Sequence, residues 1–230
     1  MITIGIVKGL AGINKKLEQN APRDREDRPK VTYFGVKDGQ TVKGRFLQEL
    51  DTESKGYNET AGVGFLAIQH QSPLDFKRNA LCSEDEGACY GCEQYRGGVS
   101  EYKQKSKLYI NFLVQSPDGT GEVVVLSQGN GPKSVTPQLL EMAGEYGTIT
   151  NRQWKIKRTG SGQTNTSYTL TPLDKDDFEY DVTQHEVYDL DKVVYEVPYD
   201  DQERYYNYVF GQQATQVTAS ASAVRDTEAW

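Results

Sequence analysis

Cysteine, histidine, methionine and tryptophan are scarce in this chain of 230 residues, which has three Cys, two His, two Met and two Trp. So few cysteines, in an odd number, exclude the paired disulfide framework of a small secreted domain. No stretch approaches the roughly 18 consecutive apolar residues of a membrane span. The first residues, MITIGIVKGLAG, lack the charged region and long apolar core of a signal peptide. We therefore expect a cytoplasmic protein without a membrane partner.

Positive charge is also in deficit. The net charge of −7 disfavours a nucleic-acid partner at first sight, because phosphate contacts need Lys and Arg. The deficit is local, however. Residues 174–204 carry 12 acidic and three basic side chains, and the remainder carries 21 acidic and 23 basic ones. An acidic segment thus follows a body that is close to neutral.

The body alternates β-branched and aromatic runs with Gly-rich turns, which predicts a mainly β protein. One helix is expected, with Thr136 as N-cap, Pro137 at its first position, and Gly144 or Gly147 at its end. Several strands, a helix and two more strands follow one another as in an OB-fold, a five-stranded Greek-key barrel. We predict this fold with short flanking helices; another small barrel or a sandwich would show the same periodicity. The expected strands are 31–36, 41–50, 63–70, 107–115, 121–127, 152–158 and 166–173.

Four segments are predicted along the chain. Residues 1–30 form an N-terminal arm and a charged linker, and residues 31–173 form the OB-fold core with an insertion at 70–106. An acidic, tyrosine-rich extension spans 174–210, and we expect part of it to fold against the barrel. Residues 211–230 are a low-complexity linker with an acidic and aromatic tip.

All three cysteines and one histidine lie within residues 70–92. His70, Cys82, Cys89 and Cys92 offer three thiolates and one imidazole, a soft four-ligand set that suits structural Zn²⁺. His70 is the least secure ligand, because the other histidine, His185, lies far along the chain. With four protein ligands the site is closed, and it lacks the signature of zinc deaminases.

Two alternatives to zinc are open. Cys89 and Cys92 could form a thioredoxin-type redox pair, but such a pair should open a helix after a strand of a βαβ unit, and neither element is evident here. The cysteines could also be inert core residues, although EDEG and YRGG around them are polar for a core.

Basic residues alternate with aromatic ones on several expected strands. Cations for the backbone and flat rings for the bases are what a single-strand groove requires, with each stacked base worth about 1–3 kcal/mol. A solvated barrel face with scattered lysines is the alternative. The candidate DNA-binding residues are Lys43, Arg45, Lys103, Lys105, Lys107, Tyr109, Phe112, Arg152, Trp154, Lys155, Lys157, Arg158 and Tyr168.

The stretches GQTVKGRFLQEL, GFLAIQH, the cysteine cluster followed by Gln-Tyr, KQKSKLYINFLVQSPDG and GEVVVL resemble the zinc-containing single-stranded-DNA-binding protein family of T-even-like bacteriophages. The resemblance covers roughly residues 39–173. It implies that His70 and the three cysteines bind zinc, that KQKSK at 103–107 is the basic motif, and that Tyr109 lies near the DNA cleft. This chain differs from the family in having no strongly basic N-terminal arm, and its spacings between the zinc-segment residues are shorter than the family's.

The resemblance implies a non-enzymatic protein that coats single-stranded DNA during phage DNA replication, recombination and repair in the bacterial host cytoplasm. Its acidic region is expected to occupy the basic groove when DNA is absent. Replication and recombination proteins are the expected partners of the tip, through Asp226, Glu228 and Trp230. The alternative is a zinc-ribbon adaptor that binds RNA or replication and transcription proteins through its acidic, tyrosine-rich region. An enzymatic zinc site is a third possibility.

Overall fold

The computed structural model describes residues 30–76, 78–116, 120–162, 165–178 and 180–207. The expected N-terminal arm up to residue 29 and the C-terminal tip with Asp226, Glu228 and Trp230 lie outside the described residues. Within the described part, none of the helices is long and apolar enough to cross a membrane.

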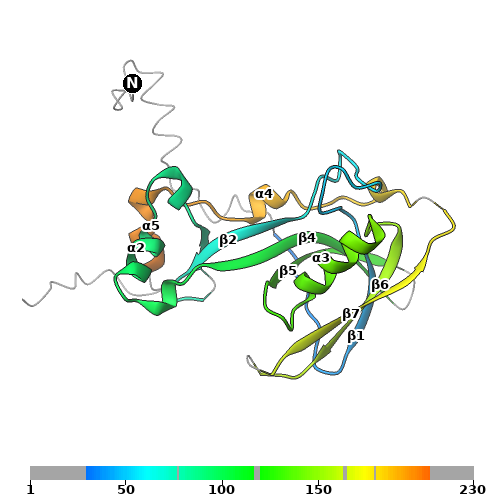
Figure 1. Ribbon diagram of the computed structural model, residues 1–230, viewed down its shortest axis with the longest axis horizontal. Coiled ribbons are helices and arrows are strands. Elements are labelled where there is room, and N and C mark those ends of the chain that lie inside the picture. Colours follow the sequence, from blue (N-terminus) through cyan, green and yellow to red (C-terminus); the bar gives the residue numbers. More distant parts are fainter. Residues whose placement is uncertain (1–29, 77, 117–119, 163–164, 179, 208–230) are drawn as a thin grey trace, which may run out of the picture.

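The described chain is mainly β, and its strands join in one open antiparallel sheet (Figure 1). The strands are β1 (Thr41–Phe46), β2 (Phe65–Gln71), β3 (Asn79–Leu81), β4 (Lys105–Gln115), β5 (Gly121–Gly129), β6 (Arg152–Thr159) and β7 (Ser167–Lys175). The helices are α2 (Tyr90–Arg96), α3 (Val135–Tyr146), α4 (Leu190–Val193) and α5 (Tyr199–Asn207), with short 3₁₀ turns η2 (Glu84–Glu86), η3 (Ser100–Tyr102) and η4 (Val182–Gln184).

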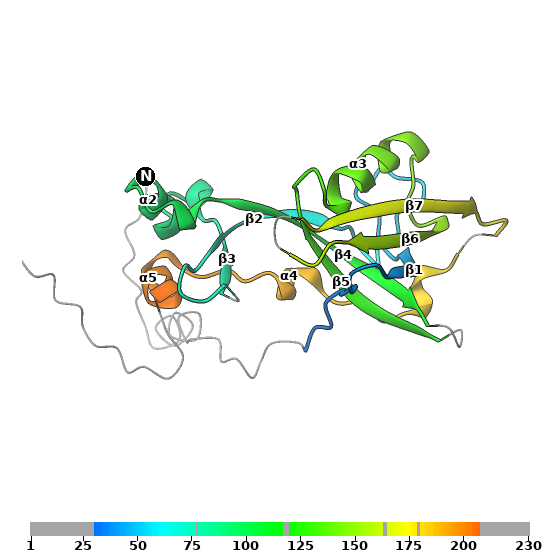
Figure 2. The ribbon, with the colours of Figure 1, turned by 90° about the horizontal axis from the view of Figure 1, so that it is seen from below.

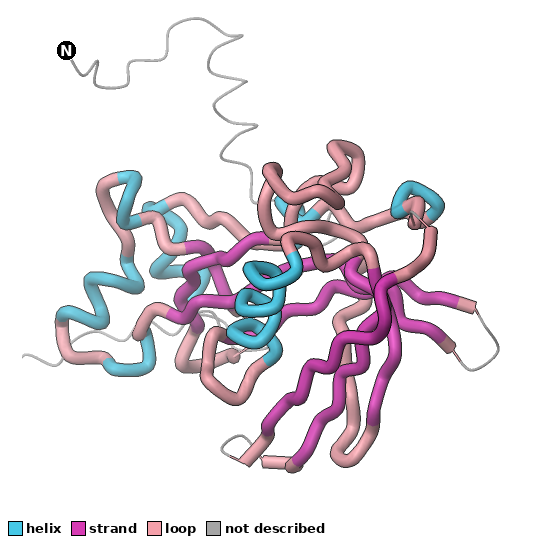
Figure 3. Tube along the Cα trace, turned by 45° about the vertical axis from the view of Figure 1, so that its right-hand side comes forward, coloured by secondary structure: helices cyan, strands magenta, loops and turns pink. Residues whose placement is uncertain are grey.

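The long strand β4 organises the sheet. One of its edges pairs with β5 along its length, and the other pairs first with β2 and then with β1. β1 continues the sheet to β6 and β7. Because β2 and β4 run on past the rest of the sheet, they carry a small group of helices at one end of the molecule, as the trace in Figure 3 shows.

The main core lies on one face of the sheet, beneath α3. Phe46, Phe112 and Trp154 are fully buried there, with ring centroids 5.0 and 5.7 Å apart around Phe46. α3 begins after Ser134 and ends at Gly147, whose φ of 70° is the left-handed conformation that ends many helices. The helix is therefore the expected one, with its N-cap two residues earlier than predicted and its end at the second of the two candidate glycines.

The sheet is not closed into a barrel. Among the described residues no ladder joins β5 to β7; instead Gln138 of α3 bonds the edge of β7, accepting from Leu170 N at 2.9 Å and donating to Tyr168 O at 2.8 Å. The expected strand at 31–36 is also absent. That segment touches β5 in a single bridge between Tyr33 and Val125.

The acidic extension turns back over the outer face of the sheet, opposite the main core. We call residues 180–197 the return segment. Its apolar side chains pack on the sheet: Val182 against Leu47 and Leu113, then Leu190 and Val194 against Tyr109. Figure 2 shows this segment running along the molecule from the β7 end to the group of helices, where α5 follows.

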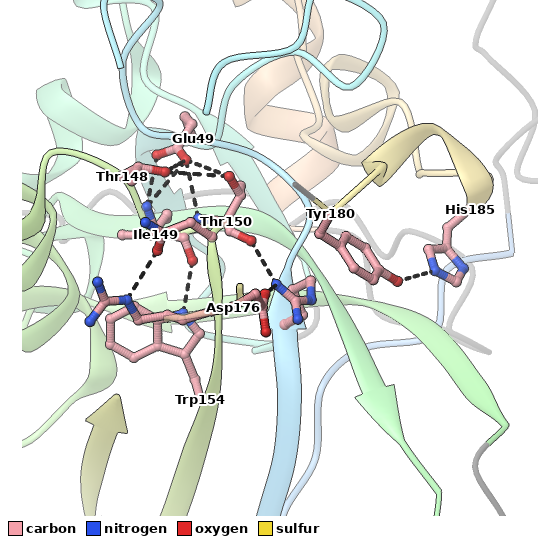
Figure 4. Close-up of polar contacts among 11 residues, drawn as sticks. Glu49, Thr148, Ile149, Thr150, Trp154, Asp176, Tyr180 and His185 are labelled. Atoms are coloured by element: carbon pink, nitrogen blue, oxygen red, sulfur yellow. Dashed lines mark hydrogen bonds and ion pairs between the residues drawn. The ribbon is translucent and has the colours of Figure 1, made fainter. Parts of the chain in front are cut away.

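A buried polar network fixes the end of β1. The Glu49 carboxylate, 1% exposed, accepts hydrogen bonds from the Thr148 hydroxyl at 2.5 Å, the Thr150 hydroxyl at 2.7 Å, and the backbone N–H groups of Ile149 and Thr150 at 3.1 Å (Figure 4). Four donors replace the water that the carboxylate loses on burial. The network therefore ties β1 to the loop between α3 and β6. A Cβ at Gly56 would lie 2.4 Å from the Glu49 carboxylate, so only glycine fits beside it.

We expect Glu49→Ala to lower the free energy of unfolding by about 3 kcal/mol or more, because it leaves these buried donors without an acceptor. Urea denaturation followed by circular dichroism measures the loss. Glu59→Ala, which truncates an exposed glutamate, is the control and should change stability by less than about 0.5 kcal/mol. Equal effects of the two substitutions would contradict the role assigned to the network.

Candidate metal centre and nucleic-acid interface

Three parts of the chain bring four metal-ligand side chains together. His70 comes from β2, Cys82 follows β3, and Cys89 and Cys92 lie at the start of α2, with their ligand atoms all within 4.8 Å of one another. We call this group the His/Cys cluster, and residues 79–102 around it the cysteine module. The cluster can hold a metal ion.

Three separations within the cluster are close to those expected around a tetrahedral ion. The Cys82 sulfur lies 3.5 Å from the Cys92 sulfur and 3.9 Å from the Cys89 sulfur, and the His70 Nε2 lies 3.3 Å from the Cys92 sulfur. Bond lengths of about 2.3 Å to sulfur and 2.0 Å to nitrogen in a tetrahedron place ligand atoms about 3.5–3.8 Å apart. The donor set and these three separations are therefore compatible with metal binding by all four side chains.

His70 is the histidine of this cluster. Its Nδ1 lies 2.6 Å from the Tyr102 carbonyl, which makes Nδ1 the protonated nitrogen and leaves Nε2 facing the sulfurs. Burial lowers the pKa of His70, so the ring is neutral at pH 7, the form that binds a metal. His185 is elsewhere, with its Nε2 2.6 Å from the Tyr180 hydroxyl.

The surroundings of the Cys89 and Cys92 thiols shift their pKa values in opposite directions. Burial opposes ionisation of Cys89, but hydrogen bonds from the backbone N–H groups of Cys92 and Ser83 hold the pKa of its thiol below the ordinary value. Burial, and then the Glu84 carboxylate 3.1 Å away, raise the pKa of the Cys92 thiol. A bound metal cation would lower the pKa of the Cys92 thiol, because it stabilises the thiolate directly.

Two further residues, Gln104 and Gly91, support the cluster. Gln104 donates from Nε2 to the sulfurs of Cys82 and Cys92, each at 3.2 Å. Gly91 lies under the His70 ring, where an added Cβ would be 2.3 Å from the His70 Cγ. The glycine within the Cys-x-x-Cys pair was the one available signal for such a close approach.

The structure bears on both alternatives to a metal site, the redox pair and the inert core cysteines. A helix does begin directly after Cys89, contrary to expectation, but the sheet around it is antiparallel and the described part contains no βαβ unit. Cys89 and Cys92 are buried, at 0% and 5% exposure, in spite of their polar neighbours in the sequence. A separate small core in this part of the protein includes Tyr206 of α5, which is far along the chain from the cysteines.

The candidate DNA-binding residues separate by exposure. Trp154 and Phe112 are fully buried in the main core, and Tyr109, 6% exposed, lies under the return segment with its hydroxyl bonded to Gln69 at 3.0 Å. These three rings hold the fold together, so they have no free face for a base. The half-buried Tyr168 also packs against the main core.

The three arginines are engaged within the protein. Arg45, 1% exposed, pairs with Asp176 at 2.6 Å and lies 4.0 Å over the Tyr180 ring, so it anchors the return segment instead of meeting phosphate (Figure 4). Arg158 donates to the Val36 and Gly160 carbonyls at 2.9 and 3.2 Å. Arg152 lies 3.9 Å over the Tyr146 ring.

The lysines are the candidates that remain accessible. Lys43 pairs in register with Lys155, and Thr41 with Lys157, so the three lysines share the outer face of the sheet. We call Lys43, Lys155 and Lys157 the lysine patch; all three are exposed. Lys105 and Lys107 lie on the same outer face at the far end of β4, and Lys103 is exposed before that strand.

Lys107 is the least exposed of these lysines. Burial, and then the charge of Lys105, lower the pKa of its ammonium group. An anion beside the two lysines would offset both effects. The return segment lies between this pair and the lysine patch, across the middle of the outer face.

No protein-family model, no curated protein and no solved structure matches this sequence.

We expect one metal ion per chain by elemental analysis, and a fall in melting temperature when a chelator removes it, because folding and metal binding share the same free energy. Cys92→Ser should reproduce the fall without a chelator. Ser167→Ala, at a half-buried residue of β7 in register with Thr159 of β6, is the control. An unchanged melting profile after chelation would contradict a structural metal site.

Gly91→Ala should weaken metal binding by at least 10-fold, because the new methyl group pushes the His70 ring away from the sulfurs. Competition with a chromophoric chelator measures the affinity. Gly97→Ala is the matched control, since its Cβ would meet neighbouring atoms no closer than 3.3 Å. Wild-type affinity in Gly91→Ala would show that the His70 ring does not need this position.

Proposed function

We propose that the protein binds single-stranded DNA, and that it coats and protects the strand during phage DNA replication, recombination and repair in the cytoplasm of a bacterial host. The lysine patch is the observation that carries this proposal. Lys43 and Lys155 are directly opposite each other on neighbouring strands, an arrangement of like charges that destabilises a sheet. Within the described part of the chain none of the three patch lysines forms an ion pair.

A polyanion offsets the repulsion in such a patch. DNA phosphates neutralise the lysine charges, and binding is driven by the release of counterions condensed on the DNA. The Thr169 and Thr171 hydroxyls, in register with Lys157 and Lys155, can donate to the same phosphate oxygens. Lys103, Lys105 and Lys107 extend the positive charge toward the cysteine module. Because the deeply buried rings are not available, base stacking falls to exposed aromatic side chains such as Phe76, Tyr95 and Phe178.

An OB-fold is the architecture we propose for the sheet. β1 pairs with both β4 and β6, β4 with β5, and β6 with β7, while α3 lies between β5 and β6 in the chain. This is the strand order of an OB-fold except for the closing pair, where Gln138 of α3 bonds the edge of β7. The resemblance to the T-even-like phage family supports the same assignment.

Structural Zn²⁺ is the ion we propose for the His/Cys cluster. Three sulfurs and one imidazole suit zinc better than the oxygen-seeking Mg²⁺ or Ca²⁺, and four protein ligands leave no open position for a reacting water. When bound, the ion supplies cross-linking and charge neutralisation. His70, Cys82, Cys89 and Cys92 would hold it, and the ends of β2 and β4 would be braced together.

The acidic C-terminal region is proposed to bind replication and recombination proteins through the tip at Asp226, Glu228 and Trp230. The part of the extension before that tip, the return segment, packs on the protein's own sheet instead. Its tyrosines are engaged internally: Tyr188 packs with Leu190 and Val194 against the sheet, and the Tyr195 ring packs at a tilt against Tyr205, with centroids 5.1 Å apart. A zinc-ribbon adaptor that uses this tyrosine-rich region as its main interface is therefore less well supported.

We expect the double substitution Lys155→Gln/Lys157→Gln to weaken binding of labelled oligo(dT) and to reduce the slope of log K against log salt by about 1.4, because each lost phosphate contact removes about 0.7 on a single strand. Fluorescence anisotropy of the oligonucleotide at several salt concentrations measures both. Trp154 emission is a poor probe of base stacking, since that ring is buried.

Lys55→Gln/Lys133→Gln carries the same change in charge at exposed positions outside both the lysine patch and the return segment, and is the matched control. It should leave the slope within about 0.3 of the wild-type value. No binding of oligo(dT) at low salt, or equal slopes in the two double variants, would contradict the proposal.

A further inference from the structure

Helix α5 lies against the cysteine module although it follows Cys92 by more than a hundred residues. Its contacts centre on Gln202, which is fully buried. The Gln202 Oε1 accepts from the backbone N–H of Tyr90 at 2.9 Å, and Nε2 donates to the Ser83 hydroxyl at 2.8 Å and to the Val197 carbonyl at 2.9 Å. Both N–H donors and the acceptor oxygen of this side chain are engaged.

The partners of Gln202 belong to both cysteine arms of the His/Cys cluster. Tyr90 is the residue after Cys89 within the Cys-x-x-Cys pair, and Ser83 is the residue after Cys82. One side chain therefore sets the distance between the two backbone segments that present the thiols. Tyr199, at the start of α5, adds a hydrogen bond to the Glu93 carboxylate at 2.8 Å.

Tyr206 connects α5 to the histidine arm. Its ring is fully buried, stacks on Tyr90 at 6.2 Å and meets the edge of Tyr102 at 5.5 Å. Tyr102 in turn supplies the carbonyl that orients His70. The Tyr206 hydroxyl is buried and has no hydrogen-bond partner among the described residues, which leaves a donor beside the module.

The far end of α5 is fixed by the hairpin of β2 and β3. The Ser72 hydroxyl donates to the Tyr206 carbonyl at 2.6 Å, and Arg78 donates to the Tyr205 carbonyl at 2.8 Å. Carbonyls in the last turn of a helix have no partner within the helix, so these bonds complete it. The helix is therefore held by the module at its start and by the turn between β2 and β3 at its end.

We propose that α5 is an outer support of the metal centre, and that docking of α5 and binding of the metal are thermodynamically coupled. Side chains that orient metal ligands commonly raise metal affinity by 10- to 100-fold. By linkage, the bound metal must favour docked α5 by the same factor. The metal centre thereby becomes the anchor for the end of the acidic return segment. This inference rests on metal binding by the His/Cys cluster and is independent of DNA binding.

The coupling is tested in both directions on the full chain, with Zn²⁺ as the probe. Chelator competition should give a zinc affinity at least 10-fold lower for Gln202→Ala than for wild type. Glu203→Ala, the exposed neighbour on the same helix, is the matched control and should bind as wild type. Equal affinities in the two variants would overturn the proposal.

The reverse direction needs no variant. Hydrogen exchange of the wild-type chain, with zinc and after chelation, should show faster exchange at the Tyr90 amide and in α5 once zinc is removed, with little change in β4 and β5. Unchanged exchange in α5 overturns the coupling, and so does equal acceleration across β4 and β5, since the metal would then stabilise the whole chain. A chain that binds zinc but not oligo(dT) refutes only the proposed function, whereas one that binds no zinc refutes both the metal assignment and the coupling.

Discussion

The meeting of three backbone segments at the His/Cys cluster is the constraint on which one end of this molecule depends. β2 supplies His70, the turn after β3 supplies Cys82, and the start of α2 supplies Cys89 and Cys92, all within 4.8 Å. The cysteine module around them has a small core of its own, made largely of tyrosines from the module and from α5. A single ion can therefore hold in register elements that so few apolar contacts leave weakly joined.

The same geometry links the metal centre to the sheet and to the C-terminal extension. β4 starts beside the cluster, where Gln104 contacts two of its sulfurs, and ends in register with β1 near the lysine patch. The return segment runs back along the outer face between these two places. Arg45 holds one end through the Tyr180 ring, and Gln202 holds the other by donating to the Val197 carbonyl. Acidic and basic residues that are far apart in the sequence are thus held on one face.

The sequence allowed the ligand set, the single long helix and most of the strands to be predicted, because each has a local signal: cysteine spacing, Pro137 after a small polar residue, and period-two alternation. Burial could not be predicted in the same way. Trp154 alternates with Lys155 and Lys157, Arg45 shares a strand face with Lys43, and Phe112 follows a lysine-rich stretch, as groove residues would. Only the register of β1 with β4 and β6 puts the two rings in the core. Gln202 and Asp176 carried no local signal, since their roles depend on contacts over more than a hundred residues.

Cross-linking tests the central claim, that this metal-braced β protein binds single-stranded DNA on its lysine-bearing face, most directly. Ultraviolet irradiation of the zinc-loaded chain with oligo(dT), followed by peptide mass spectrometry, identifies the contacts. The account predicts cross-links in peptides from β1, β6 and the start of β4 and at exposed aromatic side chains, with none at Trp154. Cross-links confined to the acidic extension, or none above the level seen with duplex DNA, would contradict it.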